Sequence, residues 1–198
     1  MPWTFFPTPE TVFADDSARF FVPLASIDLN DLRPCATGAV HWLRPLYDGN
    51  GEPPHHDSPD WPQGWFPFRR GADGRFSSLL SLTGAVRPEA NPFEHRYLGD
   101  IRAQVRSGTM TADDLLDTAH IPALGVNASP DDSLSPEDWP AGWPNANWTA
   151  MPEVLTDTTR RLAYLGALDT TSFGPGDCET VLLCDEPREL FVIVLDWS

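Results

Sequence analysis

Lysine is absent from this chain of 198 residues. All 13 basic side chains are arginine and 29 acidic side chains oppose them, which gives a formal net charge of −16. Arginine differs from lysine because its planar guanidinium pairs with a carboxylate through two hydrogen bonds. A GC-rich coding genome also produces this composition, since it favours codons for arginine, proline, alanine and glycine. We attribute the missing lysine mainly to the genome and base no functional hypothesis on it.

Cysteine is scarce too. The chain has three, Cys35, Cys178 and Cys184, an odd number without a Cys-x-x-Cys pair. The first ten residues, MPWTFFPTPE, lack the basic start and apolar run of a secretory signal peptide. We therefore expect reduced thiols and a cytoplasmic location.

Long apolar runs are also missing. No stretch approaches the roughly 18 apolar residues that a membrane-spanning helix needs, so we expect no membrane span. The large acidic excess repels nucleic acid and anionic lipid and attracts basic partners. Nucleic-acid binding and membrane association are therefore not expected, and a basic protein becomes the expected partner.

The acidic charge is concentrated in the second half of the chain. Residues 1–106 hold 13 acids and 10 bases, whereas residues 107–198 hold 16 acids and 3 bases. Residues 107–159 contain no basic residue and nine acids, namely Asp113, Asp114, Asp117, Asp131, Asp132, Glu137, Asp138, Glu153 and Asp157. Two interpretations stay open: the charge attracts a basic partner, or it only keeps the protein in solution.

The composition predicts one folded domain that spans residues 1–198. Hydrophobic residues make up 41% of the chain, which is enough for a core, and eight Trp with eleven Phe argue against disorder. The 21 prolines are about twice the usual share, so we expect many turns and extended connections.

The clearest local pattern lies at the carboxyl end. Residues 180–184 (TVLLC), a DEPR turn and residues 189–197 (ELFVIVLDW) predict a β-hairpin. The second run is apolar at every position from 190 to 195, which indicates a strand buried on both faces and placed inside a sheet. Further strands are predicted at residues 19–24, 38–43 and 75–86.

Apolar spacing and capping residues predict the helices. In residues 92–106 the side chains Phe93, Tyr97, Ile101 and Val105 form one apolar stripe that ends near Gly108. Further helical segments are predicted at residues 26–32 (capped by Ser26 or Asp28), 111–119 (capped by Thr111) and 151–168. The expected fold class is α+β: an antiparallel or mixed sheet, about three helices, long Pro/Trp-rich loops and the C-terminal hairpin central in the sheet.

A six-residue unit occurs twice, as DWPQGW at residues 60–65 and as DWPAGW at residues 138–143. Within each unit, the four residues Trp-Pro-x-Gly have Pro at the second and Gly at the fourth position, which is typical of a type I β-turn. The unit either presents two rings as a binding platform or uses them to cover part of the core, and we favour the second interpretation. The sequences that flank the two copies do not align, so a duplicated domain is not indicated.

Metal and catalytic motifs are weak. His55, His56 and Asp57 are candidate metal ligands, but adjacent histidines point in different directions and no helical spacing supports them. We favour a solvated, proline-rich loop and expect no metal and no cofactor. The chain has no Gly-x-Ser-x-Gly elbow, no phosphate-binding loop and no Gly-x-Gly-x-x-Gly motif, so we nominate no catalytic residue and favour a role other than catalysis.

The leading hypothesis is a non-catalytic acidic binding module, such as an inhibitor or a bacterial immunity-type protein that neutralises a basic partner. Its predicted contact residues are Asp131, Asp132, Glu137, Asp138, Trp139 and Trp143. Two alternatives stay open. One is a structural subunit of a larger assembly, and the other is an enzyme or ligand-binding protein whose cleft is lined by Trp61 and Trp65 together with Trp139 and Trp143.

Overall fold

The computed structural model describes residues 3–34, 36–84, 92–111, 114, 119–121, 124, 126–127, 162–169 and 178–197. In this part the helical elements are α1 (Pro9–Val12), α2 (Leu29–Leu32), α3 (Pro92–Ser107) and the 3-10 turns η1 (Asp16–Arg19) and η6 (Glu186–Arg188). The strands are β1 (Thr4–Phe5), β2 (Phe21–Asp28), β3 (Ala39–Pro45), β4 (Trp65–Arg70), β5 (Phe76–Ser78), β6 (Ala119–Ile121), β7 (Val126–Asn127), β8 (Ala163–Asp169), β9 (Cys178–Asp185) and β10 (Leu190–Trp197).

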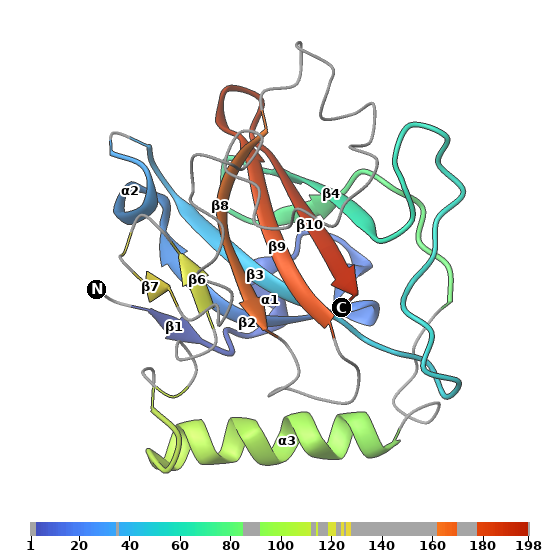
Figure 1. Ribbon diagram of the computed structural model, residues 1–198, viewed down its shortest axis with the longest axis vertical. Coiled ribbons are helices and arrows are strands. Elements are labelled where there is room, and N and C mark those ends of the chain that lie inside the picture. Colours follow the sequence, from blue (N-terminus) through green and yellow to red (C-terminus); the bar gives the residue numbers. More distant parts are fainter. Residues whose placement is uncertain are drawn as a thin grey trace.

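The strands form two sheets whose strand pairs are antiparallel. The smaller sheet has the order β1-β2-β3, and the larger has the order β5-β4-β10-β9-β8-β6-β7. In Figure 1 the hairpin β9–β10 lies in front of β2 and β3, and α3 lies below both sheets. The α+β class predicted from the sequence is confirmed, and so is the central position of the C-terminal hairpin in its sheet.

Strand β10 is buried on both faces, as its apolar run predicted. Alternate side chains enter two different clusters: Phe191, Ile193 and Leu195 join the main core with the side chains of the smaller sheet. The others enter a second cluster on the opposite face, which consists of Trp65, Leu162, Ala167, Val181, Leu183, Leu190, Val192 and Val194. The larger sheet therefore has apolar side chains packed on both of its faces.

The predicted hairpin is observed, and its two strands pair along their whole length. Leu190 pairs with Asp185 at the turn and Trp197 with Cys178 at the open end. The DEPR segment forms η6, and Glu189 closes the turn with a left-handed φ of 52°. On its other side β10 pairs with β4, from Leu190 with Arg69 to Val194 with Trp65.

Strand β2 is longer than predicted. It continues through Pro23 to Asp28, although it is the central strand of the smaller sheet. A proline is accommodated there because a register shift follows it, between Pro23 and Ala25, and because β1 pairs only with Ala25 and Ser26. The helical turn α2 is shorter than the segment predicted at residues 26–32, because residues 26–28 belong to β2. Of the two predicted caps Asp28 is the one used, and its carboxylate accepts from the Asn30 N–H.

Strand β4 is not among the strands predicted from the sequence. Pro67 interrupts its sequence pattern, yet it pairs with Val192 of β10. The Pro67 carbonyl accepts from the Leu79 N–H, and pairing with β5 begins one residue later, at Phe68. Strand β5 covers three residues, so it is shorter than the strand predicted at 75–86.

The helix predicted at residues 151–168 is wrong at its carboxyl end, where residues 163–169 form β8. Residues 151–161 lie outside the described part of the chain. A register shift between Tyr164 and Gly166 explains the error. The shift adds one residue to β8, and beyond this residue the side chains that face the core are displaced by one position. Leu165 and Leu168 therefore reach the same core although they are three residues apart, which imitates the spacing of a helix.

The helix predicted at 111–119 is described only at a few positions. Its start is as expected, since Thr111 Oγ1 and the Asp114 carboxylate bond reciprocally to each other's backbone N–H. Ala119, predicted as its last residue, instead begins β6. The remaining positions, residues 112–113 and 115–118, lie outside the described residues.

Helix α3 matches its prediction to within one residue. Ile101 is buried in the main core together with Leu98, and Tyr97 and Val105 pack at its margin. Gly108 ends the helix with a positive φ of 73°, and its N–H bonds to the Val105 carbonyl. Within the described residues, no helix combines the length and apolar character needed to cross a membrane.

One buried arginine joins the two sheets. Arg70 of β4 is 7% exposed, and its Nε and Nη2 each lie 2.6 Å from Glu189 Oε2. Its Nη1 donates to the Ala39 carbonyl of the smaller sheet at 3.2 Å, and its guanidinium lies over the Phe191 ring. Gly38 has a φ of 89°, and a Cβ at this position would lie 2.8 Å from Arg70 Nη1. Glycine is required there because of both its conformation and the space that the guanidinium occupies.

We expect the Arg70→Met substitution to lower the free energy of unfolding by about 3 kcal/mol, because it removes charged hydrogen bonds and leaves the Ala39 carbonyl unsatisfied. The matched control is Arg19→Met, which removes an exposed pair with Asp16 and should cost less than about 1 kcal/mol. Urea unfolding of both variants measures the difference. Equal losses would contradict a special role for Arg70.

Candidate functional site

The described candidate residues from the sequence are Trp65, which begins β4, and His55, His56, Asp57 and Trp61 in the long connection before it. We call this connection, residues 46–64, the β3–β4 loop. In Figure 1 it runs along one side of the molecule, in cyan and teal. It contains four acids and no arginine, and the acids are Asp48, Glu52, Asp57 and Asp60. The last three are exposed. The loop is therefore an acidic surface segment of the described structure.

The first turn of the loop is built around Asp48. Its Oδ1 accepts from the Asn50 N–H at 2.7 Å and from the Glu52 N–H at 3.0 Å. The Gly51 N–H bonds to the Asp48 carbonyl, and Gly51 takes a positive φ. The backbone hydrogen bonds from Glu52 and Asn50 hold the pKa of the Asp48 carboxyl below its usual value, so this side chain stays ionised.

The middle of the loop is held at two points. His55 and Thr83 exchange backbone hydrogen bonds of 3.1 and 2.9 Å, which ties the loop to the segment that follows β5. His56 Nε2 lies 3.1 Å from the Pro62 carbonyl, and the Gln63 side-chain amide donates to the His56 carbonyl. These contacts fix the backbone on both sides of Asp57 and Asp60.

The first tryptophan box forms a turn one residue later than predicted. The Trp65 N–H bonds to the Pro62 carbonyl, so the hydrogen-bonded turn runs from Pro62 to Trp65. Gly64 is its third residue, with a φ of 81°, which is the conformation that a type II turn requires at this position. The glycine is therefore needed inside the turn and not at its exit.

The two rings of this box occupy different environments. Trp65 is 1% exposed, begins β4 and belongs to the second cluster, whereas Trp61 is half-buried and packs against that cluster from outside. The box does not present two parallel rings to solvent. Trp65 offers no ring face to a ligand, and Trp61 keeps part of its surface accessible.

The candidate metal ligands diverge. His55 and Asp57 are exposed, whereas His56 is 1% exposed and meets the Phe66 ring edge-on. Adjacent residues of an extended segment point to opposite sides, which explains the divergence. Among the residues that the structure describes, no group of three or more His, Cys, Asp or Glu side chains is arranged to hold a metal ion.

The second tryptophan box and most of the acidic block are not described. The six predicted contact residues, Asp131, Asp132, Glu137, Asp138, Trp139 and Trp143, lie outside the described residues. Their role stays a prediction. Of the nine acids in residues 107–159, the structure describes Asp114, which is exposed.

Two buried titratable groups have surroundings that suit a structural role. His41 is 4% exposed, with Nδ1 2.6 Å from Ser26 Oγ and Nε2 3.3 Å from the Gly74 carbonyl. Burial, with a smaller contribution from Arg70, lowers the His41 pKa to about 4, so the ring is neutral. Burial also raises the pKa of the Cys184 thiol, which makes it a poor nucleophile at neutral pH.

No protein-family model, no curated protein and no solved structure matches the chain. Function is therefore inferred from the charge, the burial and the geometry of its own residues.

The His41 environment predicts a pH dependence of stability. Its pKa is about 4 in the folded state, against an ordinary value of 6.5 for a histidine exposed to water. As the pH falls from 6.5 towards 4 the unfolded chain takes up the proton first, so stability is lost across this window and the effect levels off below it. The shift corresponds to roughly 3 kcal/mol.

Measuring the free energy of unfolding of the wild type and of His41→Gln between pH 4 and pH 7.5 isolates this contribution, because the acidic groups titrate alike in both proteins. We expect the wild type to lose more stability than the variant as the pH falls. Parallel curves for the two proteins would show that His41 does not contribute.

Proposed function

We propose that the protein is a non-catalytic binding module that docks a basic protein partner, in the manner of an inhibitor or an immunity-type protein. The observation that carries the proposal is the distribution of charge. The chain has a formal net charge of −16, and in the described part of the fold six of its 13 arginines are paired with carboxylates or buried. The negative charge that remains is available at the surface to attract a positively charged partner.

Five arginines pair with carboxylates of the chain itself. The pairs are Arg19 with Asp16, Arg33 with Glu186, Arg70 with Glu189, Arg75 with Asp73 and Arg188 with Asp185. Arg44 is 1% exposed and lies over the Tyr47 ring, so it too contributes little positive charge to the surface. An approaching partner therefore meets carboxylates more often than guanidinium groups.

The β3–β4 loop is the described surface that fits this role. Glu52, Asp57 and Asp60 are exposed on it, and the hydrogen bonds at Asp48, His55 and Gln63 hold its backbone. A loop that is already ordered loses little conformational entropy when a partner binds.

Trp61 is half-buried and follows the exposed Asp60 in the sequence of the same loop. A carboxylate beside an aromatic ring suits the side chains of arginine and lysine, which bind the carboxylate through their charge and the ring through a cation–π contact. In this proposal the loop acts together with the predicted contact residues of the acidic block, Asp131, Asp132, Glu137, Asp138, Trp139 and Trp143.

The two alternative functions gain less support. A subunit of an assembly is expected to expose an apolar patch, and the large exposed hydrophobic side chain of the described surface is Leu79, at 43% exposure. A cleft lined by Trp61 and Trp65 conflicts with the burial of Trp65. We therefore retain the acidic binding module as the proposal.

The test begins with affinity capture from the source cells at low and high salt. We expect a basic partner whose association slows as the ionic strength rises. The triple variant Glu52→Gln, Asp57→Asn, Asp60→Asn should slow association with that partner by about tenfold at low salt.

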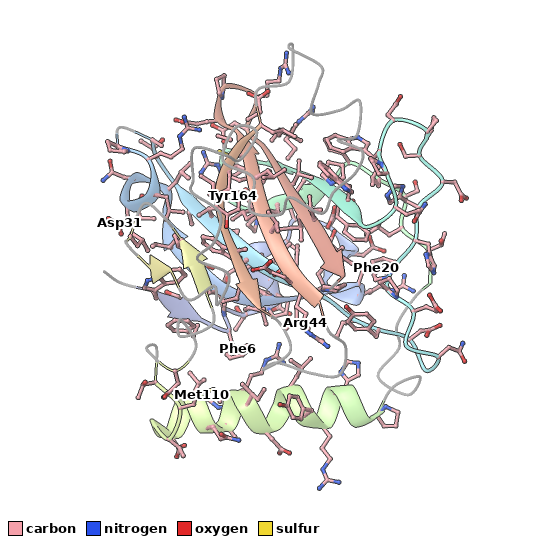
Figure 2. The ribbon with its side chains drawn as sticks, in the orientation of Figure 1. Phe6, Phe20, Asp31, Arg44, Met110 and Tyr164 are labelled. Atoms are coloured by element: carbon pink, nitrogen blue, oxygen red, sulfur yellow. The ribbon has the colours of Figure 1, made fainter. Side chains whose placement is uncertain are left out.

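A matched triple variant, Glu10→Gln, Asp31→Asn, Asp100→Asn, removes the same charge outside the loop. Figure 2 places Asp31 on the side of the molecule opposite the loop. Equal effects of the two triple variants would reject the β3–β4 loop as the contact surface. Capture of an acidic partner, or association that does not depend on salt, would reject the proposed function itself.

A further inference from the structure

Helix α3 carries basic side chains on one of its faces. His95, Arg102 and Arg106 are separated by seven and four residues, so at about 100° per residue they lie within roughly 40° of one another around the helix axis. Gly99 lies within the same sector. We call His95, Gly99, Arg102 and Arg106 the α3 stripe. Arg96, on the same helix, lies about 120° away from Arg102.

Arg102 is held in place by an aromatic ring. Its guanidinium lies 5.9 Å from the centroid of Phe6, a residue with a φ of 46° that follows β1. Figure 2 shows Phe6 between the strands and α3. Because one face of the guanidinium rests on the ring, its N–H groups are oriented before any ligand arrives.

The two arginines of the stripe are close enough for their charges to interact, and no carboxylate of the described residues pairs with either of them. Among the described residues neither Arg102 nor Arg106 forms an ion pair, although five other arginines do. Burial, and then the charge of Arg106, lower the pKa of Arg102 below its usual value. Like charges one helical turn apart are unfavourable, and an anion bound between them removes the repulsion.

His95 and Gly99 complete the stripe, and of these two Gly99 leaves space beside the arginines. His95 Nε2 is buried and has no hydrogen-bond partner within the described structure. A Cβ placed on Gly99 would meet no atom within 4 Å, so the helix surface between His95 and Arg102 is open. The stripe thus combines two guanidinium groups with room for a small ligand, whereas the enclosed His95 nitrogen does not face this open surface.

We propose that the α3 stripe binds a small doubly charged oxyanion, namely a phosphate group, either free or on a monoester. Two guanidinium groups balance two negative charges and match the oxygen geometry of phosphate. A long polyanion is disfavoured because the net charge of −16 repels it beyond the stripe. A small anion at the helix surface interacts mainly with charges within the screening length of about 8 Å. This site is independent of the proposed acidic contact surface.

Isothermal titration with inorganic phosphate and with O-phosphoserine, at constant ionic strength set with sodium chloride, tests the proposal. We expect saturable binding to the wild type and at least about tenfold weaker binding to Arg106→Gln, whose exposed position leaves the fold intact. Arg96→Gln is the matched control, since it removes one exposed arginine from another face of the same helix and should leave the affinity unchanged.

The two probes distinguish the sources of the phosphate group. Equal affinities indicate a site that recognises free phosphate, and tighter binding of O-phosphoserine indicates a monoester. Absence of saturable binding to the wild type would overturn the proposal. Equal weakening by Arg106→Gln and Arg96→Gln would also overturn the proposal, because the loss of affinity would then follow from the net charge of the protein and not from the α3 stripe. Circular dichroism of each variant confirms that α3 is retained.

Discussion

The fold depends on the burial of one strand on both of its faces. Strand β10 pairs with β9 on one edge and with β4 on the other, and its side chains alternate between two apolar clusters. Every side chain from Leu190 to Leu195 is at most 9% exposed. Burial on this scale makes the C-terminal strand the element against which both sheets and the β3–β4 connection are positioned.

Charge is arranged around this apolar framework. Arg70 reaches from β4 to the turn before β10 and to β3, so one guanidinium connects both sheets. Of the other arginine pairs, three lie within one turn each, and Arg33 at the end of α2 pairs with Glu186 of the hairpin turn. Arginine without lysine suits this use, because the planar fork satisfies several acceptors at once. Several arginines thus support the fold, and the acidic excess of the chain, a formal net charge of −16, is the basis of the proposed binding role.

Sequence reasoning was accurate where a pattern repeats over many residues. The apolar run 190–195 predicted a strand buried on both faces, and the stripe around Ile101 predicted α3 almost to the residue. It failed where one residue breaks the pattern. Pro67 concealed β4, and the extra residue before Gly166 made β8 resemble a helix. In both cases pairing with a distant strand decides the structure, and local spacing carries no information about it.

The candidate site shows the same limit. The turn in the first tryptophan box was predicted from Pro62 and Gly64, but the separation of Trp61 from Trp65 follows from the start of β4, which the sequence did not reveal. The α3 stripe was missed because the apolar face of the helix was examined and its polar face was not. The spacing of His95, Arg102 and Arg106 was the available signal.

Amide hydrogen exchange followed by NMR tests the central role of β10 most directly. The backbone amides of Val192, Ile193 and Val194 should exchange only through global unfolding, with an opening free energy equal to that from urea denaturation. The amides of the edge strand β5, Phe76–Ser78, should open at a lower free energy. Faster exchange in β10 than in β5 would contradict the account.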